Sequence, residues 1–404
     1  MANIFYAHSG GVTSVLNQIA AEVILQAKKH DSFGNVLVGA NGILGAINDE
    51  LYDTSHLNQT ELQQIANTPA SIFGSCRYKL IEGSADFRKI FSVFAKHNIK
   101  YFIYNGGNDS QDTTMKIWQA SKEHGYDLQC VGLPKTIDND LMGMDCSPGF
   151  GSAAKYIATS TMEAALDVKS MAKTSTKVFI LEVMGRHAGW LAAASSLAQT
   201  AVLDAPHIIL MPEVIFDKDK FLGKVKQTVD NVGYCVVVAS EGIKNSDNEF
   251  VSASNLVDAF GHKQLGGVAS TLAQMVKSEH GYKLHWAVAD YLQRSAGHLR
   301  SKCDVDQAKA LAQYAVQALA DGVTGKVFAV ERLPGKQYGW QVRANSIEQI
   351  ANQERCVPME FITNCGMHVT QECKQFMRPW ILGEAYPDYN QGIPDYFDKP
   401  LDMA

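Results

Sequence analysis

Two apolar stretches, Val-Phe-Ile-Leu-Glu-Val at positions 178–183 and Cys-Val-Val-Val-Ala at positions 235–239, decide the fold class of this chain. Both are short and almost uninterrupted runs of apolar residues. Strands that are buried on both faces have this composition, because helices cover both sides of a parallel sheet. The two stretches therefore predict an α/β protein in which parallel sheets lie between layers of helices.

A similar alternation of β-rich runs and helical stretches extends along the rest of the chain. Further strands are predicted over residues 3–7, 36–40, 101–104, 128–133 and 207–211. Helices are predicted over residues 15–29, 85–97, 112–124, 152–171, 187–199 and 217–231, with Ser84 as a candidate N-cap of the second. We therefore expect two Rossmann-like, three-layer α/β/α domains with mostly parallel sheets.

The two α/β blocks divide near residue 150. A chain of 404 residues is long enough for roughly two to three domains of ordinary size. We expect residues 1–150 to form one domain and residues 151–404 the other, with part of residues 290–404 packing back on the first. The tail from Tyr386 onward is rich in Pro, Asp and Tyr, which predicts irregular structure.

Composition excludes several classes of function. The chain is 46% hydrophobic and 19% charged, as in an ordinary globular protein. Lys plus Arg number 36 against 42 Asp plus Glu, which gives a net charge of −6. A basic surface for nucleic acid or anionic lipid is therefore not expected. A local cationic site for a small anion stays compatible with this total.

The chain has no run of about 18 apolar residues such as a membrane span requires, and its first residues do not resemble a signal peptide. Its eight cysteines are scattered and form no Cys-x-x-Cys pair. That pattern indicates reduced thiols, not a disulfide framework or a zinc site. We expect a cytoplasmic protein.

Two glycine loops follow predicted strands in the first block. His8-Ser9-Gly10-Gly11 and Asn105-Gly106-Gly107-Asn108-Asp109-Ser110 both lead from a strand into a helix. Glycines there allow backbone N–H groups to approach an anion, and the helix N-terminus favours negative charge. A Gly-Gly pair at such a junction is more often a tight connection only. Neither G-x-x-x-x-G-K-[ST] nor G-x-G-x-x-G occurs, so the common nucleotide fingerprints do not apply.

A third loop, Pro134-Lys135-Thr136-Ile137-Asp138-Asn139-Asp140, favours function more clearly. It places a lysine and two carboxylates directly after an apolar strand, where a structural turn gains little from them. Carboxylates so placed can bind Mg²⁺ or accept a proton from a hydroxyl group, and the lysine can neutralise a phosphate.

The second block repeats the pattern with Met184-Gly185-Arg186 after one strand and Glu241 after another. An arginine in this position suits phosphate recognition, although a salt bridge to a neighbouring helix is the structural alternative. Tyr291 and Arg294 form an aromatic–cation pair that is equally compatible with an ordinary surface. Arg77 is one more cation in a glycine loop.

Taken together, these motifs resemble the phosphofructokinase family and, within it, the pyrophosphate-dependent branch. The matches run in family order from Ser9-Gly10-Gly11 to Tyr291-Leu292-Gln293-Arg294, and Phe260-Gly261-His262-Lys263-Gln264-Leu265-Gly266-Gly267 also looks like that branch. The resemblance implies the phosphofructokinase fold and reversible phosphoryl transfer from pyrophosphate to the 1-hydroxyl of fructose 6-phosphate, in glycolysis and gluconeogenesis. Residues 1–150 would bind the donor, and residues 151–404 mainly the sugar phosphate.

On the acceptor side, the resemblance makes Asp138 the general base and Asp140 a carboxylate that supports it or the metal. The remaining sugar-side positions are then contacts to the sugar or its phosphate: Thr136, Ile137, Met184, Gly185, Arg186, Glu241, Tyr291 and Arg294. Arg186 would also take part in catalysis.

On the donor side, the resemblance assigns Gly10, Gly11, Arg77 and Lys135 to pyrophosphate. ATP-using relatives have glycine at the positions of Asp109 and Lys135, which leaves room for the nucleotide. The metal would be Mg²⁺, held near Asn108 and Asp109. The family usually has aspartate at position 108, so asparagine there shifts the metal toward Asp109 or pyrophosphate itself.

The resemblance gives a role to two further basic positions, Lys177 and His285. Lys177 lies where the family often has a basic residue that reaches a neighbouring subunit, so a homodimer or homotetramer is expected. His285 stands where a basic residue near the sugar phosphate is usual, and its charge would change near pH 6.5. The alternatives are an ATP-dependent phosphofructokinase and a non-catalytic regulatory subunit that binds sugar phosphate. A dinucleotide-dependent oxidoreductase is disfavoured, because the glycine fingerprint G-x-G-x-x-G is absent from the sequence.

Overall fold

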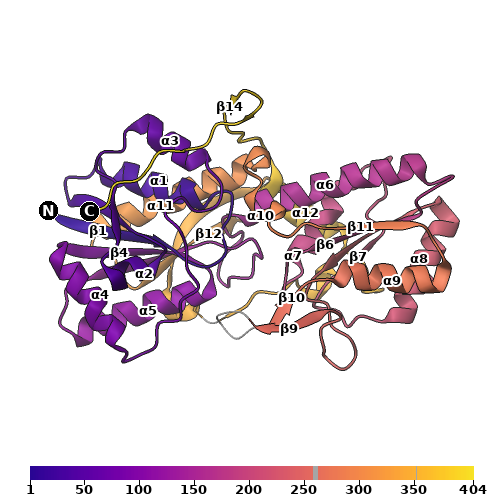
Figure 1. Cartoon of the computed structure of the whole chain (residues 1–404), viewed down its shortest axis with the longest axis horizontal. Coiled ribbons are helices and arrows are strands. Elements are labelled where there is room, and N and C mark those ends of the chain that lie inside the picture. Colours follow the sequence, from indigo (N-terminus) through magenta and orange to yellow (C-terminus); the bar gives the residue numbers. More distant parts are fainter. Residues whose placement is uncertain (258–262, 352) are drawn as a thin grey trace.

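The computed structural model describes residues 1–257, 263–351 and 353–404. The chain forms two α/β lobes side by side, each built on its own mainly parallel sheet (Figure 1). This confirms the expected fold class.

The first lobe contains a seven-stranded sheet in the order β13-β12-β5-β4-β1-β2-β3. Its central strands run parallel, and the edge strands β3 and β13 are antiparallel to their neighbours. The strands are β1 (Ala2–His8), β2 (Phe33–Gly39), β3 (Leu51–Asp53), β4 (Ile99–Gly106), β5 (Gln129–Pro134), β12 (Lys326–Leu333) and β13 (Gly339–Ser346).

Helices cover both faces of this sheet. Along β1, Ile4 and Tyr6 enter one apolar cluster, whereas Phe5 and Ala7 enter the other, as the two-residue period of a strand requires. The first face packs against α1 (Leu16–Ala27), α3 (Gln59–Asn67) and α11 (Lys302–Ala320). The second packs against α2 (Ile43–Asn48), α4 (Ala85–Lys96) and α5 (Asn108–Glu123).

The second lobe contains a four-stranded, fully parallel sheet in the order β11-β6-β8-β7. Its strands are β6 (Val178–Val183), β7 (Ile208–Leu210), β8 (Cys235–Ser240) and β11 (Leu284–Val288). Helices α6 (Phe150–Met171) and α7 (Trp190–Ala194) cover one face, and α8 (Lys218–Val232) and α9 (Val268–His280) the other. All six residues of β8 are buried, which explains its continuous apolar sequence.

Shorter elements complete the second lobe and the connections between the lobes. They are η1 (Ser195–Ala198), β9 (Ala253–Val257), β10 (Lys263–Leu265), α10 (Leu292–Ser295), η2 (Gly297–Leu299), η3 (Ile347–Gln349), η4 (Met359–Phe361), α12 (Gln371–Met377) and η5 (Arg378–Ile381). β9 and β10 form a hairpin outside the main sheet.

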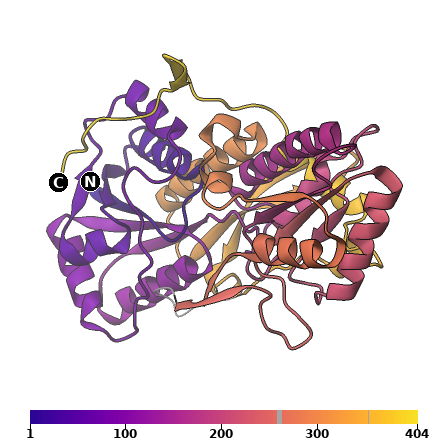
Figure 2. The same ribbon diagram turned by 45° about the vertical axis from the view of Figure 1, so that its right-hand side comes forward.

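The last part of the chain contributes elements to both lobes. After α10 the chain returns to the first lobe as α11, β12 and β13, and then crosses to α12 beside α7. Its tail carries the small hairpin β14 (Tyr389–Asn390) and β15 (Ile393–Pro394) and ends beside β3, where Asp53 N–H donates to the Asp402 carbonyl at 2.9 Å (Figures 1 and 2). The two termini therefore lie at the same end of the first lobe.

Three local predictions differ from the structure. The helix expected at 112–124 begins earlier, at Asn108, because the extended backbone of the preceding strand and loop ends at Gly107. The helix expected at 187–199 begins only at Trp190, because Glu213 accepts the Gly189 N–H and holds the preceding loop. Ser84 occupies the N-cap position of α4, but its hydroxyl caps no backbone group.

Among the described residues, none of the helices combines the length and apolarity of a membrane span.

Candidate functional site

The polar loops that the sequence singled out lie at the carboxyl ends of parallel strands in both lobes. Gly10 and Gly11 follow β1, Asn108 follows β4, and Lys135 begins the loop after β5. Arg186 follows β6 in the second lobe. In open α/β sheets this edge is where ligands bind, because strand-to-helix loops and helix N-termini meet there.

Lys135 lies against the first glycine loop. Its side chain is almost fully buried, and its ammonium group donates a hydrogen bond to the Gly11 carbonyl. Gly10 has a φ of +72° and a Cβ there would stand 3.6 Å from the Lys135 ammonium. The Gly10 N–H donates to the Cys76 carbonyl at 3.0 Å, so the loop that carries Arg77 is tied to the same place.

Two further cations, Arg294 and Arg77, lie near this ammonium group. Burial is the largest cause that lowers the pKa of Lys135 to about 7, and the charges of Arg294 and Arg77 add to it, whereas Asp138 opposes the shift. A Cβ on Gly11 would lie 3.3 Å from Arg294 Nη1, which places that guanidinium beside the loop. Lys135, Arg77 and Arg294 therefore lie close together, and the pKa of the lysine is lowered. A bound anion would stabilise the charged form of the lysine.

Asp138 and Asp140 are two neighbouring carboxylates in the same loop as Lys135. Burial raises the pKa of Asp138, and the charges of Asp140 and Glu241 raise it further. Burial also raises the pKa of Asp140, while a hydrogen bond with the Thr136 hydroxyl lowers it. The same hydroxyl accepts the Asp138 N–H at 3.1 Å. A carboxylate whose pKa is raised in this way is a candidate proton acceptor.

The loop after β6 brings the second lobe to these carboxylates. Gly185 has a φ of +134°, and a Cβ there would stand 2.6 Å from the Ala188 carbonyl, so this position requires glycine. Its N–H lies 3.4 Å from Glu241 Oε1. Arg186 is close enough to lower the pKa of both Asp138 and Glu241, whose pKa burial raises. The two lobes therefore share one cluster of charges.

The other predicted sugar-side residues lie along the same edge. Arg294 stacks on the Tyr291 ring at 3.8 Å, and that ring is 62% exposed. The Met184 N–H donates to Gln293 Oε1 at 3.3 Å, which joins the two loops of the second lobe. Ile137 is buried in the apolar cluster below the loop, so only its backbone faces the site.

Asn108 and Asp109 lie in the first turn of α5. Asn108 Nδ2 donates to the Gln353 carbonyl at 2.7 Å, and Asp109 is exposed. Over the described ranges, no three His, Cys, Asp or Glu side chains gather so as to hold a metal ion. Oxygen ligands from one or two residues still fit Mg²⁺, which usually completes its coordination with water and substrate phosphates.

Two predicted residues lie away from the cluster within one chain. Lys177 precedes β6, and its ammonium group donates to the Ala172 carbonyl. His285 is exposed on β11 and pairs in register with Phe179, near the amino end of β6. Arg186 follows the opposite end of that strand, so Lys177 and His285 lie away from it in the same subunit. The motif residues Phe260, Gly261 and His262 lie outside the described residues.

Sequence reasoning missed the C-terminal segment at residues 353–357. Its backbone contacts both Asn108 and the Asp140 loop, and Glu354 Oε1 lies 2.8 Å from His187 Nδ1. No periodicity or motif marks this segment in the sequence, and its contacts arise only from the return of the chain between the lobes.

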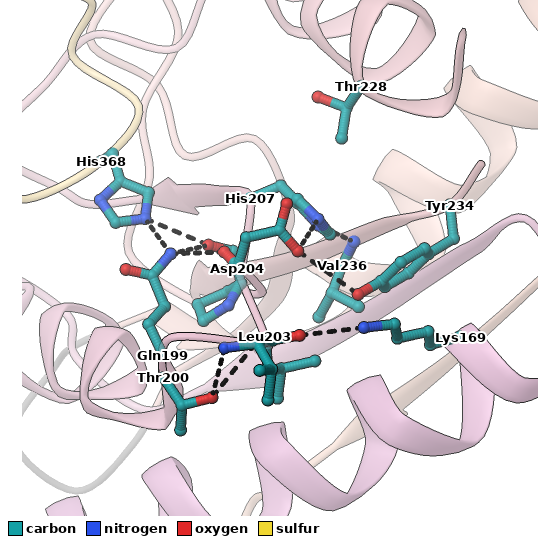
Figure 3. A network of polar contacts seen from close by, with 12 residues as sticks. Lys169, Gln199, Thr200, Leu203, Asp204, His207, Thr228, Tyr234, Val236 and His368 are labelled. Carbon is teal, nitrogen blue, oxygen red and sulfur yellow. Dashed lines mark hydrogen bonds and ion pairs between the residues drawn. The ribbon is translucent and has the colours of Figure 1, made fainter. Parts of the chain in front are cut away.

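A second polar network lies at the amino ends of β7 and β8 (Figure 3). Asp204 Oδ1 lies 3.3 Å from His207 Nε2 and 3.5 Å from the Tyr234 hydroxyl. Gln199 Nε2 donates to the Asp204 and Pro206 carbonyls at 2.5 and 3.0 Å. These contacts stay within the second lobe and connect a loop to the sheet.

Comparison with known proteins agrees with this geometry. A family model described as Phosphofructokinase matches residues 3–319. Pyrophosphate--fructose 6-phosphate 1-phosphotransferase of Halomonas elongata is 49% identical over 97% of this chain and 94% of its own length. The protein of the same description from Xanthomonas campestris pv. campestris is 50% identical over 98% and 95%.

A solved structure shows the same likeness. The crystal structure of pyrophosphate-dependent phosphofructokinase from Marinobacter aquaeolei has a TM-score of 0.92 to this chain at 47% sequence identity. The match covers 100% of this chain and 97% of that one.

Proposed function

The chain belongs to the phosphofructokinase family and transfers a phosphoryl group from pyrophosphate to fructose 6-phosphate, and we propose that it does so at the charge cluster between the lobes. The observation that carries this assignment is the buried Lys135 ammonium group against the Gly10–Gly11 loop, with Arg77 and Arg294 near it. This concentration of positive charge fits a compact, highly charged donor.

Pyrophosphate binds at the glycine loop on the first lobe. The Lys135 ammonium group fills space beside Gly10 and Gly11, and Asp109 occupies the exposed first turn of α5. ATP would have to place its nucleoside and its third phosphate beside the first turn of α5, where the Asp109 carboxylate would repel the phosphate. The loop therefore favours pyrophosphate over ATP by both space and charge.

Asp138 accepts the proton of the sugar 1-hydroxyl as its oxygen attacks phosphorus. The phosphorus–oxygen bond of pyrophosphate then breaks, and phosphate leaves toward Lys135. Asp140 holds the Asp138 loop through the Thr136 hydroxyl and keeps the pKa of the base high. A raised pKa makes the carboxylate a stronger proton acceptor.

The second lobe holds the sugar phosphate. Arg186 faces Asp138 and stabilises charge that develops during transfer, and Glu241 accepts sugar hydroxyl groups. The Met184–Arg186 loop and the Tyr291–Arg294 turn bind the sugar and its 6-phosphate.

Mg²⁺ would be held by Asn108 or Asp109 together with pyrophosphate oxygens. When bound, it neutralises negative charge on the transferred phosphoryl group. The hydrogen bond from Asn108 Nδ2 to the Gln353 carbonyl holds this side chain at the start of α5.

The active form is a homodimer or a homotetramer that pairs through β11. Among the described residues, β6 is the one strand paired with β11, and Trp286 and Val288 on β11 are 48% and 39% exposed. Lys177 and His285 lie beside this surface, where they can reach the sugar phosphate of a second copy. The eight free thiols fit a reducing compartment, the cytoplasm.

A donor panel on the purified protein tests the proposal. Initial rates are measured with fructose 6-phosphate, Mg²⁺ and either pyrophosphate or ATP at equal concentration. We expect turnover with pyrophosphate and little with ATP. A clear preference for ATP would refute the donor assignment, and absence of turnover with either would favour a regulatory sugar-phosphate-binding subunit.

A further inference from the structure

The C-terminal segment 353–357 joins the loops that form the site, although the matching family model ends at residue 319. On the first lobe, the Gln353 carbonyl accepts from Asn108 Nδ2 at 2.7 Å. The Arg355 N–H donates to the Asp140 carbonyl at 2.8 Å. The segment is therefore bonded both to the donor side and to the loop that carries the base.

Glu354 extends this connection to the second lobe. Its Oε1 lies 2.8 Å from Nδ1 of His187, the residue directly after Arg186. It also pairs with Leu141 through an isolated antiparallel bridge, so its backbone lies beside the end of the Asp138–Asp140 loop. Glu354 thus contacts the end of the base loop through its backbone and the residue after Arg186 through its side chain.

The ion pair itself contributes little to folding. The side chains of His187 and Glu354 are 40% and 47% exposed. Exposed pairs of this kind stabilise proteins by about 0–1 kcal/mol. The charge of Glu354 nevertheless acts on the base loop. Burial is the largest cause that raises the pKa of Asp140, and the Glu354 charge raises it further.

Other contacts fix the segment without the Glu354 carboxylate. Arg355 Nη1 donates to the Met144 and Asp145 carbonyls at 2.8 and 2.7 Å, and its guanidinium lies 4.7 Å from the Trp190 ring centroid. The Val357 N–H donates to Glu213 Oε1 at 2.8 Å. The Glu354 side chain can therefore be changed while its backbone stays anchored on both sides.

We propose that Glu354 is a positioning residue for phosphoryl transfer, which orients His187 and the base loop relative to each other across the site. This inference rests on the proposed roles of Asp138 and Arg186. It adds a residue from beyond the part of the chain that the family model covers. Glu354 does not touch the reacting atoms, and acts through His187 and Asp140.

The test compares Glu354→Ala and Glu354→Gln with wild type and with Glu360→Gln. Glu360 is an exposed carboxylate in η4, a few residues beyond this segment, and serves as the matched control. We expect Glu354→Ala to lower kcat by about tenfold while the KM values for both substrates change by less than about threefold, because the lost interaction matters in the transition state. Glutamine can still accept the His187 N–H, so Glu354→Gln should recover most of kcat.

A double-mutant cycle with His187→Ala adds a second readout. If the two side chains act as one unit, the double variant should be no slower than the slower single variant. The thermal midpoint should stay at the wild-type value in all variants. Wild-type turnover with pyrophosphate tests the proposed function separately, since only the ratios between variants report on Glu354.

Three outcomes would overturn the proposal. Glu354→Ala with wild-type kcat would show that the carboxylate positions nothing. A higher KM with unchanged kcat would make it a binding group. A loss of kcat that follows a lower thermal midpoint, or that Glu360→Gln reproduces, would make it structural.

Discussion

The two ends of the parallel strands carry polar clusters of opposite character. At the carboxyl ends, Lys135 and Asp138 are held where burial disfavours their charged forms, as the lowered pKa of the lysine and the raised pKa of the aspartate show. At the amino ends of β7 and β8, Asp204 and His207 lie within hydrogen-bonding distance of each other, and Gln199 spans two backbone carbonyls (Figure 3).

The two clusters differ in the partners of their charged and polar groups. The contacts of the amino-end network lie within the second lobe: the Val236 N–H donates to His207 Nδ1 at 3.0 Å, and burial lowers the pKa of that imidazole. The carboxyl-end cluster places three cations around one glycine loop and two carboxylates beside each other. An anion bound beside Lys135 would stabilise the charged form of the lysine, whereas the amino-end contacts connect a loop to the sheet. We therefore expect the carboxyl-end cluster to act in phosphoryl transfer and the amino-end network to serve folding.

The largest effect should come from Asp138→Asn. Asparagine keeps the shape of the side chain but cannot accept the proton of the sugar hydroxyl. Since a positioned general base typically contributes about 10²- to 10⁴-fold, we expect kcat to fall by that factor. Steady-state rates with pyrophosphate and fructose 6-phosphate measure it.

Asp204→Asn is the matched control from the other end of the sheet. It makes the same chemical change at a carboxylate that the proposed reaction does not use, and kcat should stay at the wild-type value. Equal losses in both variants would abolish the distinction between the two clusters.

The next largest effect should come from Lys135→Met. Methionine fills a similar volume without charge, so the variant loses an ammonium group beside the transferred phosphate. Removal of one such group typically costs about 10²- to 10³-fold in rate, and we expect that loss in kcat/KM for pyrophosphate. The KM for fructose 6-phosphate should change much less. An equal loss for both substrates would place Lys135 outside the donor site.

A smaller effect, on stability only, should come from Gln199→Ala. The variant removes donors to the Asp204 and Pro206 carbonyls and the acceptor of the Lys374 ammonium group. Leaving such groups without partners costs about 1–3 kcal/mol, and we expect the free energy of unfolding to fall within that range. Denaturant unfolding measures the change. A fall in kcat of the folded variant would show that this network also serves the reaction.

The sequence predicted the carboxyl-end cluster far better than its surroundings. Lys135, Asp138 and Asp140 lie within six residues of one strand end, so their proximity is local and a pattern can show it. The approach of Arg294 to Gly11 depends on how two lobes pack, and so do the contacts of Glu354. No local pattern encodes those distances.

The same reasoning explains which elements were predicted. The strands β6 and β8 are buried on both faces, and their composition shows it. The edge strand β11 carries exposed residues, among them Trp286, and has no such run. The return of β12 and β13 to the first sheet is a matter of topology, which residue composition does not record.

The smallest effect should be a gain in stability from Asp138→Asn in the free enzyme. The folded state raises the pKa of Asp138 above its ordinary value of 3.8, so the folded protein binds this proton more tightly than the unfolded chain. The aspartate therefore destabilises the fold increasingly as pH rises from 3.8 through the raised pKa. Asparagine removes the charge but remains a buried polar group, so only part of this cost is recovered.

We expect a gain of about 1 kcal/mol above the raised pKa, which for a chain of 404 residues is roughly 1 °C in the thermal midpoint. The gain should shrink as pH falls toward 3.8, where both side chains are neutral. Thermal unfolding of both proteins between pH 9 and 5 measures it. A gain that is independent of pH would mean that Asp138 carries no unfavourable charge, and the contrast between the two ends of the strands would then rest on the lysine alone.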